Sequence, residues 1–195
     1  MKQMNEMDAD IRRLRTIYRW RGKLVALPLV VALFCTWREN ENHLSLWIVT
    51  AALFAVGLGI RLWSQQHIHY RLKISGHVTM TGPYALVRNP IYIGNTIICL
   101  ALTIGSELLW MLPATFIVCC IVYGLTVKYE ELNLPEQFGQ PYLDYVQRVP
   151  RWLPRFPKTP APLTFVNEHL GKSLVAEAHT LIFLAAVAAK ELITW

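Results

Sequence analysis

The chain has 195 residues, of which 54% are hydrophobic and only 16% are charged, and its formal net charge is +6. Ordinary soluble domains carry about 25% charged residues, so this composition argues against a water-soluble domain and favours one surrounded by lipid. A positive charge of this size is also typical of nucleic-acid binding, but the positions of the charges, described below, argue against that class.

Residues 1–23 form a basic arm that leads into the first apolar segment. The stretch IRRLRTIYRWRGKL interleaves basic residues with apolar and aromatic ones, which is typical of a helix lying in the membrane interface. The apolar segment at residues 24–37 is short for a span unless Tyr18 and Trp20 serve as interface anchors. Because no small-residue cleavage site follows it, we interpret it as a membrane span rather than a signal peptide.

Four further apolar segments follow, at residues 46–63, 91–105, 108–127 and 173–193. A transmembrane helix needs about 20 apolar residues, and the segment 91–105 is short by that measure. Only Ser106 and Glu107 separate it from the next segment, so these two are predicted to form one tight helical hairpin. The sequence therefore predicts an all-α integral membrane protein with five transmembrane helices.

These segments divide a single membrane domain, residues 1–195, into four parts. They are the basic arm at 1–23, the first two spans at 24–75, a core that contains the hairpin at 76–158, and a C-terminal helix at 159–195. Prolines in the stretch RWLPRFPKTPAPL, residues 151–163, prevent a regular helix there. We expect this stretch to form a lid at the membrane surface.

Most of the 19 lysines and arginines lie in the N-terminal arm and in the connections after the second and fourth spans. The opposite side holds only Arg38 and, near the C-terminus, Lys190. The positive-inside rule then places the N-terminus and the loop at 76–90 in the cytoplasm. We expect a multi-pass protein of the bacterial inner membrane, and no nucleic-acid partner.

The four cysteines, Cys35, Cys99, Cys119 and Cys120, all lie in apolar runs without a CxxC spacing. We interpret them as small buried hydrophobic residues rather than disulfide partners or metal ligands. No metal is expected.

Polar and aromatic residues gather where the third span begins. The stretch GPYALVRNPIYIG, residues 82–94, places Arg88, Asn89 and Tyr92 at the mouth of an apolar helix. The hairpin returns the chain to the same face, so Tyr92 and Asn89 are predicted to lie beside Glu130. Taken singly, each has a structural explanation: an interface tyrosine, an orienting charge, a helix cap before proline, or a solvated carboxylate.

The order of motifs across residues 76–154 is more specific than any one of them. TGPYALVRNPIYIG, then a helical hairpin, then EELNLPEQFGQPYLDYVQRVPRWLP resembles the isoprenylcysteine carboxyl methyltransferase family and the related phospholipid N-methyltransferases. The resemblance implies an integral membrane methyltransferase that uses S-adenosyl-L-methionine, with a cofactor pocket on the cytoplasmic side. It also implies a lipid or lipophilic small molecule as the methyl acceptor.

The resemblance further implies which residues contact the cofactor, within the core at 76–158. They are His77, Val78, Thr79, Met80, Tyr84, Asn89, Pro90, Ile91, Tyr92 and Glu130. The chemistry agrees, because a carboxylate suits the cofactor's ammonium or ribose diol, and tyrosine rings suit its sulfonium and adenine. Arg88 suits the cofactor carboxylate, although an orienting role in the membrane explains it equally well.

Two residues depart from the family pattern. Asn89 stands where a histidine is usual, which keeps hydrogen bonding but removes proton chemistry. Thr126 stands where prenylcysteine enzymes carry the arginine that holds the substrate carboxylate. An amine, thiol or hydroxyl acceptor on a hydrophobic body is therefore expected ahead of a prenylcysteine acid.

Two alternative functions and the role of two residues stay open at this point. A membrane reductase of the sterol-reductase type would use NADPH, and a non-enzymatic membrane adaptor would bind neither cofactor. In the last span, Glu177 and His179 are either functional residues inside the membrane or solvated groups at its edge.

Overall fold

The computed structural model describes residues 2–35, 43–73, 77–155 and 170–194 of the chain. The described parts contain helices and turns and no strand. The six α-helices are α1 (Lys2–Phe34), α2 (His43–Lys73), α3 (Pro90–Gly105), α4 (Leu112–Phe138), α5 (Gln140–Arg148) and α6 (Leu170–Thr194). Two short 3-10 helices, η1 (Gly82–Ala85) and η2 (Leu109–Met111), precede α3 and α4 respectively.

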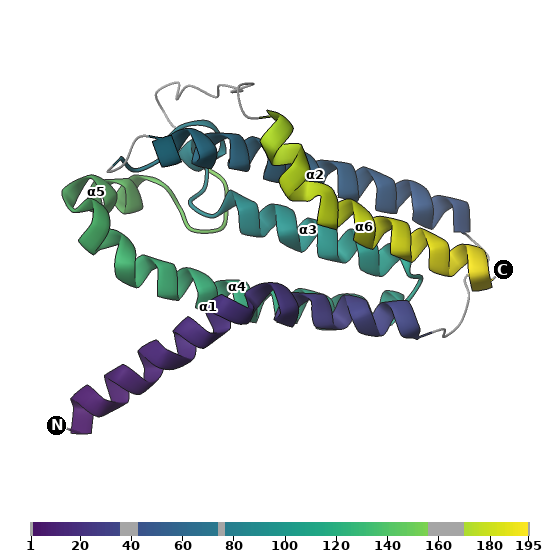
Figure 1. The fold of residues 1–195 in the computed structure, drawn as a ribbon, viewed down its shortest axis with the longest axis horizontal. Helices are drawn as coiled ribbons and strands as arrows, with labels where there is room; N and C mark the ends of the chain where they lie inside the picture. Colours follow the sequence, from purple (N-terminus) through teal and green to yellow (C-terminus); the bar gives the residue numbers. More distant parts are fainter. Residues whose placement is uncertain (1, 36–42, 74–76, 156–169, 195) are drawn as a thin grey trace.

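The long helices lie side by side as a bundle and alternate in direction (Figure 1). The N-terminus, the turn before α3 and the short helix α5 lie toward one end of the bundle. The α3–α4 turn and the C-terminus lie at the other end. The predicted hairpin is confirmed, because α3 and α4 run antiparallel with only a short turn between them.

The predicted helix of the basic arm runs directly into the first apolar segment, as expected. The basic arm and the first apolar segment form one continuous helix, α1, which passes through Pro28 and ends at Phe34. Its N-terminal part projects away from the bundle (Figure 1). The predicted end of the segment at residue 37 lies outside the described residues.

Three helical segments are long and apolar enough to cross a membrane: Leu44–Ile68, Leu109–Phe138 and Ser173–Lys190. They correspond to the second, fourth and fifth predicted spans. The helix Pro90–Gly105 is apolar but shorter, and the described residues of the first predicted span are not among these segments, so five spans stay a prediction. Both α2 and α4 continue well beyond the predicted ends because Glu, Gln, Leu and Lys sustain a helix outside lipid.

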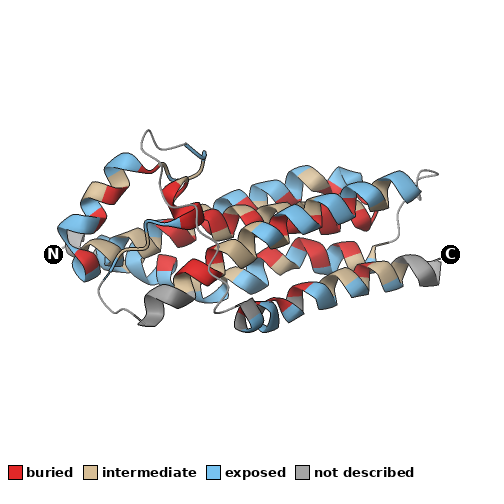
Figure 2. Ribbon diagram, turned by 90° about the horizontal axis from the view of Figure 1, so that it is seen from above, coloured by how far each residue is buried: buried red, intermediate tan, exposed pale blue. Residues whose placement is uncertain are grey.

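Large apolar side chains cover the outside of the bundle. Leu27, Phe34, Phe116 and Ile182 are each more than half exposed. Figure 2 shows buried residues along the inner faces of the helices and exposed ones along the outer faces. Such extended exposed apolar surface is what a lipid environment accommodates.

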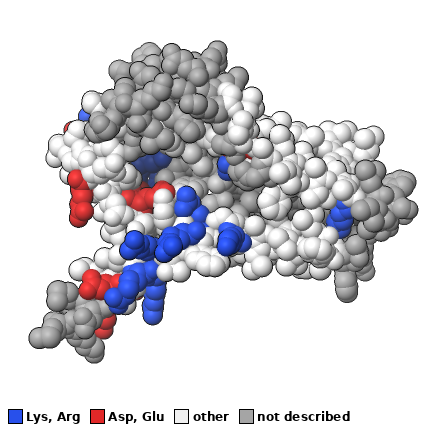
Figure 3. All heavy atoms as spheres, in the orientation of Figure 1, with Lys and Arg blue, Asp and Glu red and all other residues white. Residues whose placement is uncertain are grey.

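Charged side chains are distributed unevenly along the bundle. In the face shown by Figure 3, lysines and arginines gather over the α1 arm and the adjoining end of the bundle. Most of the remaining visible surface carries no charge. This arrangement agrees with the prediction that the arm and the connections rich in lysine and arginine lie at one end of the bundle.

Helices α2 and α3 approach each other closely at two glycines. A Cβ atom added at Gly57 would lie 2.7 Å from Ile98 Cγ1 and 2.9 Å from the Gly94 carbonyl oxygen. A Cβ atom at Gly94 would lie 2.8 Å from Arg61 Cγ. Glycine at both positions therefore lets the two backbones touch, and it brings the Arg61 side chain across α3.

Candidate functional site

The turn before α3 depends on a glycine. Gly82 has a φ of +59°, and a Cβ atom there would lie 2.2 Å from His67 Nε2. His67 is buried, and its Nδ1 lies 3.0 Å from Thr81 Oγ1. A left-handed backbone without a side chain is thus required where the loop passes over α2.

Asn89 and Pro90 begin α3 as the sequence predicts, with proline at the first helical position. The Asn89 side chain does not cap the helix, however. Its Nδ2 donates instead to the carbonyl oxygen of Arg151, at 3.2 Å. Asn89 therefore joins the turn to the segment that follows α5.

Backbone hydrogen bonds reinforce this junction. The amide of Arg88 donates to Pro150 O at 2.9 Å, and the amide of Arg155 donates to Leu86 O at 3.0 Å. The Tyr145 hydroxyl of α5 donates to the carbonyl oxygen of Tyr84 at 2.8 Å. The predicted lid thus begins as a strap bound to the α3 turn, while its residues 156–163 lie outside the described part of the chain.

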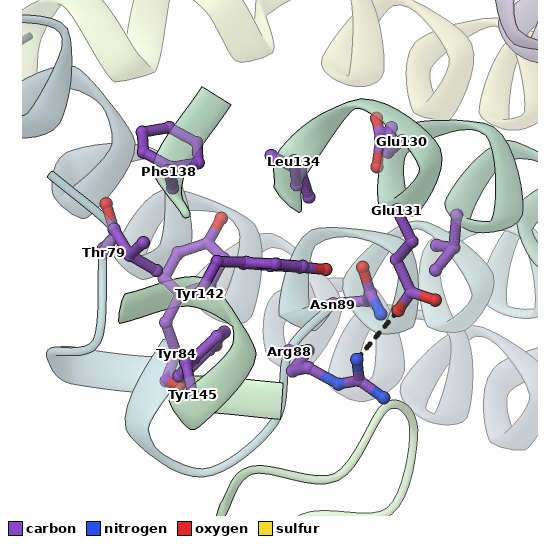
Figure 4. A pocket seen from close by; sticks show the side chains of 12 residues that line it. Thr79, Tyr84, Arg88, Asn89, Glu130, Glu131, Leu134, Phe138, Tyr142 and Tyr145 are labelled. Carbon is purple, nitrogen blue, oxygen red and sulfur yellow. Dashed lines mark hydrogen bonds and ion pairs between the residues drawn. The ribbon is translucent and has the colours of Figure 1, made fainter. Parts of the chain in front are cut away.

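Glu131 forms ion pairs with two arginines of this junction. Arg88 Nη1 lies 3.0 Å from Glu131 Oε1, the contact drawn as a dashed line in Figure 4. Arg151 Nε donates to the same oxygen at 3.1 Å, and its Nη2 contacts Oε2. Three separate segments are therefore held together by one carboxylate.

Glu130, the neighbouring carboxylate, meets α3. The Tyr92 hydroxyl donates to Glu130 Oε1 at 2.7 Å. The ring of Tyr92 stacks on that of Tyr123, with centroids 4.8 Å apart. The predicted juxtaposition of Tyr92 with Glu130 across the hairpin is confirmed.

Side chains from the α3 turn, α4 and α5 surround a small polar pocket. Figure 4 shows Tyr84, Tyr142 and Tyr145 on one side of it and Arg88, Asn89 and Glu131 on the other. Its free volume is about 70 Å³. Burial, and next the nearby Glu131, raise the pKa of the Tyr142 phenol, so this group stays a neutral hydrogen-bond donor at neutral pH.

The pocket brings together only some of the residues predicted to contact a cofactor. Val78, Thr79, Tyr84, Asn89 and Glu130 line it. His77, Met80, Pro90 and Ile91 are not among its lining residues, and Tyr92 lines the adjoining groove instead. The role of all ten in cofactor binding stays a prediction.

Other lining residues escaped the sequence reasoning. Val127, Glu131, Leu134 and Phe138 recur at helical spacing, so they face the pocket together with Glu130. Tyr142 and Tyr145 are three residues apart and fall on one face of α5. The periodicity of α4 and the tyrosine spacing in PYLDYVQR could have identified both sets.

The groups around the pocket match the chemistry of the predicted cofactor. Thr79 Oγ1 and Arg88 Nε are buried and have no hydrogen-bond partner in the described structure, which is expected where a polar ligand is to bind. Carboxylate, aromatic and guanidinium groups suit its ammonium, adenine and carboxylate. Binding pockets for small molecules usually measure about 300–1,000 Å³, so the pocket must open to admit the whole molecule.

An apolar groove lies on the other side of Tyr92. It runs between α3 and α4, has a volume of about 380 Å³ and reaches Trp152 at the strap. Ile93, Ile97 and Phe116 are among its lining residues. The Tyr92–Glu130 hydrogen bond therefore joins a polar pocket to an apolar groove.

Glu177 lies in neither cavity and is not a solvated group. Its side chain is 1% exposed and pairs with Arg61 of α2. The alternative that Glu177 merely solvates a helix start is therefore wrong, whereas the side chain of His179 lies outside the described residues. Among the described residues, no group of three His, Cys, Asp or Glu side chains could hold a metal ion.

Comparison with known proteins finds a family model that matches about half of the chain. The model is described as phospholipid methyltransferase, and it matches residues 43–141. This stretch runs from the start of α2 into the first residues of α5, and it includes the hairpin with Tyr92 and Glu130.

Three relatives illustrate the range of similar proteins. A mouse protein-S-isoprenylcysteine O-methyltransferase is 34% identical over 113 residues, which are 53% of this chain and 35% of that protein. The nickel-cobalt-cadmium resistance protein NccN of Alcaligenes xylosoxydans xylosoxydans is 29% identical over 114 residues, 56% of this chain and 53% of that protein. The cobalt-zinc-cadmium resistance protein CzcN of Cupriavidus metallidurans is 29% identical over 138 residues, 70% of this chain and 62% of that protein.

The matches thus span between 35% and 62% of the length of these three relatives. No solved structure matches the chain significantly.

Proposed function

The chain belongs to the phospholipid methyltransferase family, and on this premise we propose that it is a membrane methyltransferase. Its methyl donor is S-adenosyl-L-methionine, and its acceptor is a lipid or a lipophilic small molecule. The donor binds the polar pocket from the water side, and the acceptor enters the apolar groove from the membrane.

The observation that carries the proposal is the Tyr92–Glu130 contact. Tyr92 borders the groove and Glu130 borders the pocket, and their hydrogen bond measures 2.7 Å. A methyl donor with a charged amino-acid end and an acceptor with an apolar body need two such compartments that meet. The contact marks the boundary at which donor and acceptor would come together.

The pocket residues would hold the donor by its charged and aromatic parts. Glu130 would bind the ammonium or ribose hydroxyls, and the Arg88 Nε group, which has no partner in the described structure, would bind the carboxylate. Tyr84 and Tyr142 offer aromatic faces for the adenine and the cation. When bound, S-adenosyl-L-methionine supplies an electrophilic methyl group on a sulfonium.

The protein's own contribution is proximity, orientation and the exclusion of water. Trp152 of the strap and the Tyr92–Tyr123 stack border the groove. They would hold the apolar acceptor so that its nucleophilic atom points toward Glu130. No proton transfer is assigned to Asn89, because its amide is not a titratable group.

The acceptor is proposed to carry an amine, thiol or hydroxyl. Thr126, at the position where an arginine would hold a carboxylate, is fully buried, and its Oγ1 has no hydrogen-bond partner in the described structure. A threonine hydroxyl provides no charge to hold a carboxylate at the reacting end.

The pocket is proposed to face the cytoplasm. The connections rich in lysine and arginine lie at its end of the bundle, as the positive-inside rule requires of a cytoplasmic side. A cysteine introduced at Thr79 should react with a membrane-impermeant maleimide only after the cells are opened. Labelling in intact cells would reverse the proposed orientation.

Calorimetry in detergent tests the donor. S-adenosylhomocysteine should bind the purified chain, whereas NADPH should not. Binding of NADPH alone would favour a reductase of the sterol-reductase type, and binding of neither would favour a non-enzymatic adaptor.

Transfer of a tritiated methyl group tests the acceptor. The panel would compare phosphatidylethanolamine, lipophilic thiols and a farnesylcysteine analogue. Methylation of the first two classes is expected, and turnover of the farnesylcysteine acid alone would contradict the argument from Thr126.

A further inference from the structure

An arginine–glutamate pair lies inside the bundle, between α2 and α6. Arg61 Nε donates to Glu177 Oε2 at 2.9 Å, and Arg61 Nη2 donates to Glu177 Oε1 at 2.8 Å. Thr180 Oγ1 also donates to Glu177 at 3.0 Å, and Gln65 Nε2 contacts its other oxygen. The charge of the Glu177 carboxylate is therefore balanced by Arg61, and both of its oxygens accept hydrogen bonds from protein side chains.

The ion pair with Glu177 does not engage all the N–H donors of the Arg61 guanidinium. Arginine has five N–H donors in a planar fork, and Glu177 takes one from Nε and one from Nη2. The bonds to Glu177 do not involve Nη1, and the Arg61 side chain is 13% exposed. Arg61 is one of the residues that line a cavity inside the bundle.

This second cavity shares no lining residue with the polar pocket and only Tyr123 with the apolar groove. It measures about 390 Å³ and is lined by residues from α1, α2, α3, α4 and α6. Much of its wall is apolar, with Leu29, Ile98, Leu102 and Phe183 among its side chains. A long apolar chain would therefore find the environment that it has in lipid.

The polar end of the cavity has an unused group of its own. Asn95 lines the cavity, and its Oδ1 is buried without a hydrogen-bond partner in the described structure. A 180° turn of the amide would exchange this acceptor for the Nδ2 donors, so Asn95 can serve a ligand of either kind. An unpaired polar atom at this depth points to a ligand that completes it.

The charges at the cavity favour an anion. Glu177 is already paired with Arg61, and Lys23 lines the cavity as a further cation. Because Glu177 balances Arg61, Lys23 leaves the cavity with a surplus of one positive charge, which favours an anionic head group that contacts Arg61. The cavity thus combines an apolar chamber with a site for one negative head group.

We propose that this cavity binds an anionic amphiphile, with its carboxylate or phosphate on Arg61 and Asn95 and its chain along the apolar wall. The proposal goes beyond the methyltransferase activity and does not rest on it. Tyr123 lines the cavity, and Glu130 of the polar pocket lies about 10 Å farther along α4, from a rise of ~1.5 Å per residue. Asn95 lies one helical turn beyond Tyr92 on α3, so the proposed head-group site adjoins the Tyr92–Glu130 contact without coinciding with it.

Direct binding measurements would test the proposal. The purified full chain in a neutral detergent would be titrated with radiolabelled oleate, which has a carboxylate, and with dioleoyl phosphatidylglycerol, which has a phosphate. Dioleoyl phosphatidylcholine, whose head group has no net charge, is the control lipid. Saturable binding of oleate or of phosphatidylglycerol, but not of phosphatidylcholine, is expected, and the tighter of the two identifies the source of the head group.

Charge variants separate a binding role from a structural one. The double variant Arg61→Gln/Glu177→Gln removes both charges together and should weaken anion binding about tenfold or more, the loss of a charge-assisted contact. Glu177→Gln alone keeps Arg61 cationic and frees it from its partner, so anion binding should be retained or tightened. A purely structural pair would give losses in both variants.

A third variant tests the apolar part without touching any charge. Ala26→Phe places a large ring in the cavity wall and should reduce binding of the acyl chain while leaving the Arg61–Glu177 pair in place. Lys128→Gln, which removes an exposed cation of α4 outside the cavity, is the matched control and should bind like the unaltered chain. Equal retention of all three lipids, or unchanged binding in the double variant, would overturn the proposal.

Discussion

The polar pocket and the second cavity are each built beside an arginine–glutamate pair, but water reaches the two pairs to different extents. At the pocket, the Glu131 side chain is 19% exposed and one of its partners, Arg151, is 45% exposed. In the cavity, Glu177 is 1% exposed and Arg61 is 13% exposed. A charge that water cannot solvate must be matched by the protein, so Glu131 can lose the exposed Arg151, whereas Glu177 needs Arg61.

The largest expected effect comes from removing one partner of the buried pair. Arg61→Ala would leave Glu177 charged and without its cation, which is expected to reduce the free energy of unfolding by ~3–5 kcal/mol. Thermal unfolding in detergent measures it. The double variant Arg61→Gln/Glu177→Gln should recover most of the loss, and an equal loss in both variants would show that packing rather than charge is responsible.

The next effect concerns ligand binding at the pocket rather than stability. Glu130→Ala and Tyr92→Ala are each expected to weaken S-adenosylhomocysteine binding by ~1.5–3 kcal/mol, the scale of a charge-assisted hydrogen bond. Calorimetry on the folded variants measures it, with Lys128→Gln as the control. Unaltered affinity in both variants would mean that the donor binds elsewhere.

The turn before α3, which borders the polar pocket, can be destabilised without changing any charge. Gly82→Ala puts a side chain on a left-handed backbone, at ~1–2 kcal/mol, and forces its Cβ against the ring of His67. The free energy of unfolding should fall by at least that amount, whereas Gly59→Ala, where an added Cβ meets nothing within 4 Å, should be neutral or stabilising. If Gly82→Ala matched Gly59→Ala, the turn would be less constrained than its geometry implies.

The smallest effect is expected at the exposed ion pair. Arg151→Ala leaves Glu131 paired with Arg88, so the free energy of unfolding should change by only ~0–1 kcal/mol. Raising the salt concentration should reduce this small difference further. A loss as large as that of Arg61→Ala would end the distinction between the two pairs.

The sequence predicts the pocket far better than the cavity, and the reason is chain distance. Tyr92 and Glu130 lie on the two arms of one tight hairpin, so the apolar runs and the short turn are sufficient to predict that they meet. Arg61 and Glu177 are 116 residues apart, and only the packing of α2 against α6 brings them together. A one-chain sequence carries no signal for that pairing.

The apolar pattern also fails to predict where the helices end. It marks where lipid can surround a helix, but α4 continues through Lys128 to Phe138 because its later residues favour a helix in water as well. That extension carries Glu130, Glu131 and Leu134 to the pocket. The tyrosines of α5 were missed for a related reason, since the helix is short and its apolar face packs on α4 rather than in lipid.

The hairpin has a consequence for how such proteins diversify. The stretch that matches the family, residues 43–141, carries both arms of the hairpin, whereas all of α1 and all of α6 lie outside it. One contiguous module therefore carries Tyr92 and Glu130, whereas α1 and α6, which lie outside it, contribute lining residues to the second cavity. Exchanging α1 and α6 between relatives should transfer lipid preference while the inherited module keeps its chemistry.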